Sequence, residues 1–194
     1  MAKLPGPNKI KTAIFISGKG SNLYNLINFS FTKKSPVEIV YVISNNSDAK
    51  GLNFAKKYKI KNKIYAFKNK SKDESKIITY LHKNNIKLIC LAGFMKILSR
   101  NFIKKFKGKI LNIHPSLLPK YKGLNTHQRA IENNEKFSGC TVHFVNYKID
   151  SGKIILQKKV KISKNDTPSK LARKILKHEH ILYAKAIMKL FSNP

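Results

Sequence analysis

The sequence predicts an α/β fold in which a mostly parallel sheet carries helices on both faces. Over the first two thirds of the chain, short and almost continuously apolar runs alternate with segments of helical periodicity, which is typical of parallel strands buried on both sides. In the last third, two strand-like runs are joined by a connection too short for a helix, which predicts an antiparallel hairpin. A long amphipathic stretch ends the chain and predicts a closing helix.

Each element follows from its local pattern. Strands are expected at 11–17, 37–44, 63–67, 86–93 and 109–114, and helices at 22–30, 48–59, 73–85 and 99–107. Asp48 is expected to cap its helix, and the strand at 86–93, the most apolar, is expected at the centre of the sheet. The hairpin is expected at 139–146 and 152–160 and the closing helix at 168–191. We expect one domain over residues 1–194.

The chain carries a large positive charge, with 40 basic residues against nine acidic ones and a net charge of +31. Nucleic-acid binding would explain this excess, but only Arg100, Arg129 and Arg173 are arginines and the lysines are spread along the chain. A lysine-rich compositional bias and a field that attracts small anions both remain open. We therefore expect small-molecule substrates and no specific nucleic acid.

Localisation and redox state follow from what the sequence lacks. It has no apolar run long enough for a membrane span and no signal-peptide pattern. Cys90 and Cys140 lie far apart and form no CxxC motif. We expect a cytoplasmic protein with free thiols and no membrane partner, either a monomer or a homodimer.

A glycine-rich turn, ISGKGSNL, follows the first predicted strand and opens the first helix. Its glycines permit close backbone approach, and Ser21 and Asn22 add donors at a helix N-terminus, where an anion is favoured. Leu23 stands where the dinucleotide fingerprint needs glycine, and the Walker ending is absent. The turn predicts a monophosphate site, with an ordinary strand–helix connection as the alternative.

The segment LAGFMKIL leaves the central strand through Gly93 and stays apolar. An apolar loop at the ends of parallel strands suits a flat, partly apolar ligand. Ordinary core packing is the alternative for this segment.

Asn112 and His114 end the strand at 109–114, immediately before Pro115. Residues two apart on a strand point to one face, so the amide can donate to an oxyanion beside an imidazole that can carry a proton. A structural histidine is the alternative. Metal binding is disfavoured because His178 and His180 face different ways on a helix and no HExxH motif occurs, and we expect no metal.

Five ordered motifs together resemble the glycinamide ribonucleotide formyltransferase family over roughly residues 10–191. They are ISGKGSNL, LAGFMKILS, LNIHPSLLPKYKGLNTHQRAIEN, TVHFV with IDSGKIILQ, and HEHILY. The resemblance implies a Rossmann-like formyltransferase fold. It also implies transfer of a formyl group from 10-formyltetrahydrofolate, the co-substrate, to the amine of 5-phosphoribosylglycinamide, in purine synthesis.

The resemblance also implies roles for individual residues. Asn112, His114 and Asp150 match the catalytic trio of the family, and Asp150 is expected to raise the pKa of His114. The ribonucleotide would be bound by Gly20, Ser21, Asn22 and Glu179. The folate would be bound by Lys70, Met95, Lys96, Ile97, Leu98 and Asn112, with Lys72 as a rival to Lys70.

Some positions depart from the family pattern and some rivals share part of it. Lys96 replaces a usual arginine, Lys122 a common proline and Asn125 a frequent histidine. Methionyl-tRNA formyltransferase and formyltetrahydrofolate deformylase share the catalytic domain, but each carries a further domain that we do not expect here. A nucleic-acid-binding protein would explain the charge and would leave the trio without a role.

Overall fold

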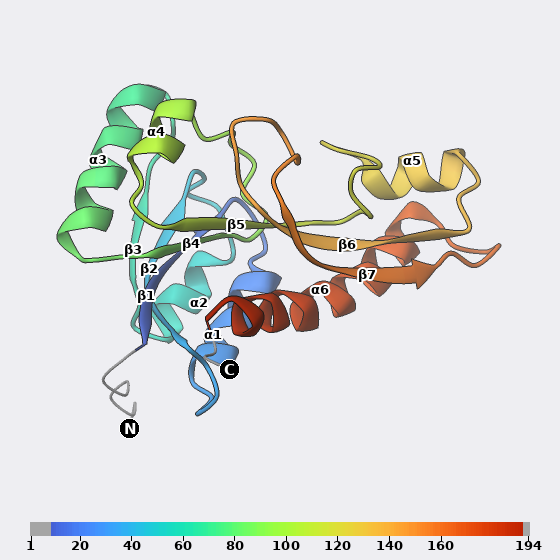
Figure 1. The fold of residues 1–194 in the computed structure, drawn as a ribbon, viewed down its shortest axis with the longest axis horizontal. Helices are drawn as coiled ribbons and strands as arrows, with labels where there is room; N and C mark the ends of the chain where they lie inside the picture. Colours follow the sequence, from blue (N-terminus) through green and yellow to red (C-terminus); the bar gives the residue numbers. More distant parts are fainter. Residues whose placement is uncertain (1–8, 192–194) are drawn as a thin grey trace.

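The computed structural model describes residues 9–191 and contains a seven-stranded sheet (Figure 1). Its strands are β1 (Ile10–Ile16), β2 (Val37–Ser44), β3 (Lys61–Ile64), β4 (Leu88–Leu91), β5 (Lys109–His114), β6 (Phe137–Phe144) and β7 (Ile154–Lys161). Their order is β3-β2-β1-β4-β5-β6-β7, so β4 is central as predicted. The first five strands pair in parallel, whereas β6 pairs antiparallel with both β5 and β7. The predicted fold class is confirmed.

The helices are α1 (Ser21–Ser30), α2 (Leu52–Lys57), α3 (Lys70–Lys83), α4 (Arg100–Lys105), α5 (Thr126–Glu132) and α6 (Pro168–Phe191). The predicted bounds of β2, β5 and α6 are correct. Helix α3 begins three residues earlier than predicted, because the Asn69 side chain accepts a hydrogen bond from the Lys72 N–H and caps the helix. Strand β3 also begins earlier, and α5 was not predicted at all.

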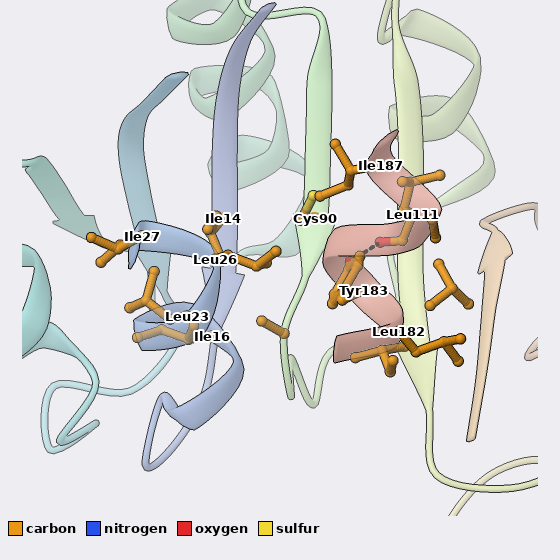
Figure 2. Close-up of a cluster of buried hydrophobic side chains, with 14 of the residues drawn as sticks. Ile14, Ile16, Leu23, Leu26, Ile27, Cys90, Leu111, Leu182, Tyr183 and Ile187 are labelled. Carbon is orange, nitrogen blue, oxygen red and sulfur yellow. Dashed lines mark hydrogen bonds between the residues drawn. The ribbon is translucent and has the colours of Figure 1, made fainter. Parts of the chain in front are cut away.

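Side chains on β4 alternate between two apolar cores. Leu88 and Cys90 face the core shared with α1, α2 and α6, whereas Ile89 and Leu91 face the core under α3 and α4. Figure 1 shows these two sets of helices on opposite sides of the sheet, and Figure 2 shows Cys90 packed beside Tyr183 and Ile187 of α6. The near-continuous apolar character of β4 therefore comes from burial on both faces.

The turn after β1 explains why α2 is shorter than predicted. Gly20 has a φ of 76°, and a Cβ on it would lie 2.5 Å from the Gly51 Cα. The Gly51 N–H donates to the Gly18 carbonyl at 3.0 Å, and α2 begins only after Gly51. The expectation that Asp48 caps this helix was wrong, because contact between the two glycine segments decides where the helix begins.

Helix α6 closes the structure along the face that carries α1. Thr167 precedes it, and the Thr167 hydroxyl accepts from the Lys170 N–H at 3.3 Å while Pro168 occupies the first turn, as is common at helix starts. Its buried residues include the predicted Leu171, Ile175, Leu182 and Ala186. Among residues 9–191, no helix is both long and apolar enough to cross a membrane.

We predict that Tyr183→Phe lowers the free energy of unfolding by about 1 kcal/mol, the usual contribution of one hydrogen bond. The fully buried Tyr183 hydroxyl lies 3.1 Å from the carbonyls of both Leu91 and Leu111, and so ties α6 to β4 and β5 (Figure 2). Denaturant unfolding would measure the change. Tyr147→Phe, at an exposed tyrosine, is the control, and equal stability of the two variants would contradict the prediction.

Candidate active site

Strand β5 presents Asn112 and His114 on one face, as their spacing predicts. Leu111 and Ile113 point to the core under α6, so the two polar residues point to the opposite face, with Ile110. His114 is 5% exposed, and Asn112 is half-buried. Both lie where the first of the antiparallel pairings begins, at the carboxyl end of a parallel strand.

Asp150 reaches this face from the connection between β6 and β7. Its Oδ2 lies 3.3 Å from the His114 Nδ1 and accepts a hydrogen bond from the Gly123 N–H at 2.9 Å. The Asn112 amide donates to the Asp150 Oδ1 at 3.4 Å. Figure 1 shows the β6–β7 connection rising on the side of the sheet that carries α4, so the three predicted residues meet on one face.

His143 is a member of this cluster that sequence reasoning missed. It lies opposite Asn112 in the β5–β6 register, with 3.3 Å between its Nε2 and the Asn112 Nδ2, and 3.6 Å between its Nε2 and the Asp150 Oδ1. The His143 Nδ1 lies 2.9 Å from the Phe144 carbonyl and donates to it, so in the neutral ring Nε2 is the acceptor. A histidine in TVHF was visible in the sequence, but only the strand register places it opposite Asn112.

A backbone carbonyl supplies the other partner of His114. The His114 Nε2 lies 2.9 Å from the Tyr121 carbonyl and donates a hydrogen bond to it. The Ser116 hydroxyl donates to the neighbouring Lys120 carbonyl at 2.7 Å and holds this loop. Both ring nitrogens of His114 therefore face oxygen atoms, so a second proton on the ring would find an acceptor.

Burial lowers the pKa of His114 below its ordinary value, although the Tyr121 carbonyl and the Asp150 carboxylate both act to raise it. Asp150 raises the pKa of His114 as expected, but the net pKa is lowered, because the cost of removing the charged ring from water exceeds the help of its partners. Near neutral pH the imidazole is consequently neutral and can accept a proton.

Asp150 stays ionised beside this histidine. Its burial acts to raise its pKa, but contacts with His143, the Gly123 N–H and His114 together hold it below the ordinary value. The site therefore contains a carboxylate that is fixed by two elements of the chain and is 3.3 Å from a neutral imidazole.

The residues predicted for a ribonucleotide lie on the other face of the sheet end. The Asn22 amide donates to the Glu179 Oε2 at 2.7 Å, and both side chains are buried. Burial raises the pKa of Glu179, while the Asn22 contact acts to lower it. Ser21 is the first residue of α1 and Gly20 precedes it with a left-handed backbone, so the structure gathers these four predicted residues around the start of α1.

The segment predicted to line a folate pocket lies between these two clusters. The Met95 N–H donates to the Ser17 hydroxyl at 2.7 Å, and that hydroxyl donates to Asn45, which joins the loops after β1, β2 and β4. Met95 and Ile97 are 65% and 60% exposed, and Lys96 is exposed as well. Leu98 is buried in the core under α3 and α4, so its side chain serves packing.

Lys70 begins α3 and lines a cavity of about 310 Å³ together with Glu74 and Ser99. Ser99 follows Leu98 directly and is held by Glu74, whose Oε1 accepts from the Ser99 N–H at 2.8 Å. Lys72 does not line this cavity. Lys70 therefore shares a cavity with Ser99, the residue that follows the Met95–Leu98 segment, and none of residues 95–98 lines that cavity.

The two cysteines are buried and poorly suited to act as nucleophiles. Burial raises the pKa of Cys90 and of Cys140 to about 12, so both thiols stay protonated. Within residues 9–191 no group of three or more histidine, cysteine, aspartate or glutamate side chains could hold a metal ion.

An asparagine amide and a proton-accepting imidazole beside one strand end, without a reactive thiol nearby, suit an enzyme that passes an acyl group directly between two bound molecules. Comparison with known proteins agrees with this class. The chain belongs to the formyl transferase family, whose model matches residues 10–187.

Named relatives cover most of the chain. Phosphoribosylglycinamide formyltransferase of Haemophilus influenzae is 45% identical over 91% of this chain and 85% of its own length. The crystal structure of phosphoribosylglycinamide formyltransferase from Brucella melitensis has a TM-score of 0.89 and 41% identity, with 96% of this chain and 97% of that one covered. The trifunctional purine biosynthetic protein adenosine-3 of Gallus gallus is 42% identical, but the chain spans only 18% of its length.

We predict that the pKa of the His114 imidazole lies below 6.5, its ordinary value. In Asp150→Asn this pKa should be lower still, because the carboxylate acts to raise it. Imidazole NMR shifts against pH would give both midpoints. Since the folded pKa is depressed, the unfolded chain takes up this proton first. His114 therefore makes the folded state less stable as pH falls from about 6.5 toward the folded pKa.

Asp166→Asn is the matched control for this titration. It removes the same charge from a carboxylate that pairs with Lys174 at 2.6 Å, and it should leave the His114 midpoint unchanged. A wild-type midpoint above 6.5, or a higher one in Asp150→Asn, would contradict the assignment.

Proposed function

We propose that the protein transfers the formyl group of 10-formyltetrahydrofolate to the amine of 5-phosphoribosylglycinamide, giving formylglycinamide ribonucleotide and tetrahydrofolate in purine biosynthesis. The observation that carries this proposal is the cluster of Asn112, His114 and Asp150 at the end of β5. It occurs in a chain that matches named phosphoribosylglycinamide formyltransferases over most of both lengths.

In the proposed reaction the substrate amine attacks the formyl carbon and forms a tetrahedral oxyanion. The Asn112 amide would donate to that oxygen. Its present contacts with His143 and Asp150, at 3.3 and 3.4 Å, are longer than the usual N–H···O distance of about 2.9–3.0 Å. The amide is thus oriented by weak contacts that the carbonyl oxygen can replace.

His114 would carry the proton that has to move. The attacking amine becomes acidic as its C–N bond forms. Because Nε2 donates to the Tyr121 carbonyl, the proton would go to Nδ1 of the neutral imidazole, the nitrogen that faces Asp150, with a water molecule as the relay. The imidazolium then lies 3.3 Å from the Asp150 carboxylate and next to the oxyanion, and both favour its charge. The proton passes to N10 of the folate as the old C–N bond breaks and tetrahydrofolate leaves.

The two substrates would approach from different sides of the sheet end. The ribonucleotide phosphate would bind the backbone at Gly20–Asn22 and the Ser21 hydroxyl, at the N-terminus of a ten-residue helix, and Glu179 would contact the rest of the ribonucleotide. The folate would lie along Met95–Leu98, with Lys70 at its carboxylate end.

The positive charge fits this choice of substrates. Both are anionic, and a diffuse field of lysines attracts small anions without the arginine-rich patch that base recognition uses. We propose a cytoplasmic enzyme of one domain over residues 1–194, a monomer or homodimer without specific nucleic-acid or membrane partners.

A formyl-transfer assay tests the proposal and its rivals together. We expect turnover with 10-formyltetrahydrofolate and 5-phosphoribosylglycinamide, and none when methionyl-tRNA or water replaces the ribonucleotide as acceptor. Both His114→Ala and Asp150→Asn should lower kcat by roughly a hundredfold or more, within the range for a lost proton-transfer group. Asn112→Ala should lower kcat on the order of a hundredfold, with smaller changes in KM.

The double variant of His114 and Asp150 distinguishes a catalytic pair from two structural residues. Because Asp150 acts through His114, its loss should matter little once the imidazole is gone, and the two effects should be clearly less than additive. Asp166→Asn again serves as the control. Near wild-type turnover in either single variant, or full additivity in the double, would rule out the assigned roles.

We predict that Lys70→Gln raises the KM for the folate several-fold and leaves the KM for the ribonucleotide unchanged, whereas Lys72→Gln changes neither. Lys70 lines the cavity beside Ser99, and Lys72 does not. Loss of one exposed charge contact is worth about 1 kcal/mol or less, which corresponds to at most about a fivefold change. Equal effects of the two variants would remove Lys70 from the folate site.

A further inference from the structure

A second cavity, of about 370 Å³, lies behind the loop that holds His114. Strand β5 pairs with β6 only as far as His114 and Thr141, so the beginning of β6, at Phe137–Cys140, has no β5 residue beside it. The loop after β5, the connection between α5 and β6, and the strands β6 and β7 supply the residues that line it. Apart from Tyr121, whose backbone carbonyl accepts from His114, the residues that line it play no part in the proposed transfer reaction.

The charged groups of the cavity favour an anion. Lys120, Lys136 and Lys159 line it together with one acid, Glu135. Hydrogen bonds from the Lys120 ammonium and the Tyr121 hydroxyl lower the pKa of Glu135, and Lys120 lies 2.6 Å from it. Glu135 is thus ionised and already neutralised by Lys120. Lys136 and Lys159 form no ion pair within residues 9–191.

One further contact points to a ligand with an apolar part next to its charged group. The Lys159 ammonium sits 3.8 Å from the centre of the Phe137 ring, which places a cation beside an apolar surface.

Tyr121 connects this cavity to the catalytic histidine. Its hydroxyl donates to the Glu135 Oε1 at 2.8 Å inside the cavity, and its backbone carbonyl accepts from the His114 Nε2 at 2.9 Å. An anion that competes with Glu135 for Lys120 therefore perturbs the residue that holds one nitrogen of His114.

We propose that this cavity is a second ligand site, which binds a small anion through its phosphate or carboxylate group, and that its occupancy is coupled to His114 through Tyr121. Lys136 and Lys159 bind the charged group, Lys120 is shared between this group and Glu135, and Phe137 and Leu117 contact the apolar part of the ligand. By reciprocity, any change that binding causes at His114 is matched by an equal effect of His114 protonation on the affinity.

Binding of phenyl phosphate and of benzoate, followed by calorimetry and by NMR, tests the site and distinguishes the two anionic groups. We expect saturable binding of at least one of these probes. Lys159→Gln should weaken it about tenfold, as expected for loss of a charge-assisted hydrogen bond. The substitution is small, and circular dichroism would confirm that the fold is retained.

Two controls make the result decisive. Lys164→Gln removes the same charge from an exposed lysine outside the cavity and should leave the affinity unchanged. Ser21→Ala alters the proposed ribonucleotide phosphate site and should also leave it unchanged. Absence of saturable binding, equal weakening by Lys164→Gln, or loss of binding in Ser21→Ala but not in Lys159→Gln would overturn the proposal. These outcomes do not depend on formyl transfer.

The coupling is tested separately. Saturation with the probe that binds should shift the His114 imidazole midpoint in the wild type. In Tyr121→Phe, which loses the hydroxyl contact with Glu135 and keeps the backbone carbonyl, the probe should still bind and the shift should shrink. Binding without any change at His114 in the wild type would overturn the coupling.

Discussion

The alternation of side chains along β5 is the constraint on which the rest of the site depends. Leu111 and Ile113 are buried against the core under α6, so Asn112 and His114 must emerge on the opposite face. A slip of one residue would put the amide and the imidazole into an apolar core and expose two large aliphatic side chains. The Tyr183 hydroxyl, 3.1 Å from the Leu111 carbonyl, holds the strand in this register.

Given that register, the chemistry at His114 depends on a balance between burial and partners. The ring is buried, which favours its neutral form, while Tyr121 and Asp150 supply acceptors for both nitrogens. Such a ring is neutral near neutral pH, and both of its nitrogens have an acceptor once it carries a second proton. In the proposed reaction a developing oxyanion nearby would add to the stabilisation of that charge, so the site is suited to transient protonation.

The sequence predicts well those features that depend on local pattern. Strand 37–44 follows Pro36, strand 109–114 ends before Pro115, and the helix from 168 begins at a proline, so their bounds are correct. Helix α2 was predicted too long because a contact between Gly20 and Gly51, distant in sequence, sets its start. Helix α5 was missed because a seven-residue helix with two buried side chains has too little periodicity to detect.

The same distinction applies to the site. The spacing of Asn112 and His114 was sufficient to place them on one face, and the resemblance supplied Asp150. The contact of His143 with Asn112 depends on the β5–β6 register, and the contact of the Tyr121 carbonyl with His114 depends on the path of a loop. Neither contact can be predicted from residue types alone. The net direction of the His114 pKa shift could not be predicted for a related reason. A sequence shows that a carboxylate is a candidate partner, but it does not show how far the fold removes the ring from water.

The two polar clusters give the loops after β1 and β4 a part in the proposed site, beside strand β5. Asn22 and Glu179 belong to α1 and α6, on one face, whereas His114 and Asp150 lie on the other. A molecule that contacts both clusters must pass around the ends of the parallel strands. The Ser17 hydroxyl binds both Asn45 and the Met95 N–H, and it thereby joins the loops after β1, β2 and β4 at these strand ends. In the proposed function the two substrates would meet on the face of β5 that carries Asn112 and His114, so the positions of all three loops around them would depend on one hydroxyl.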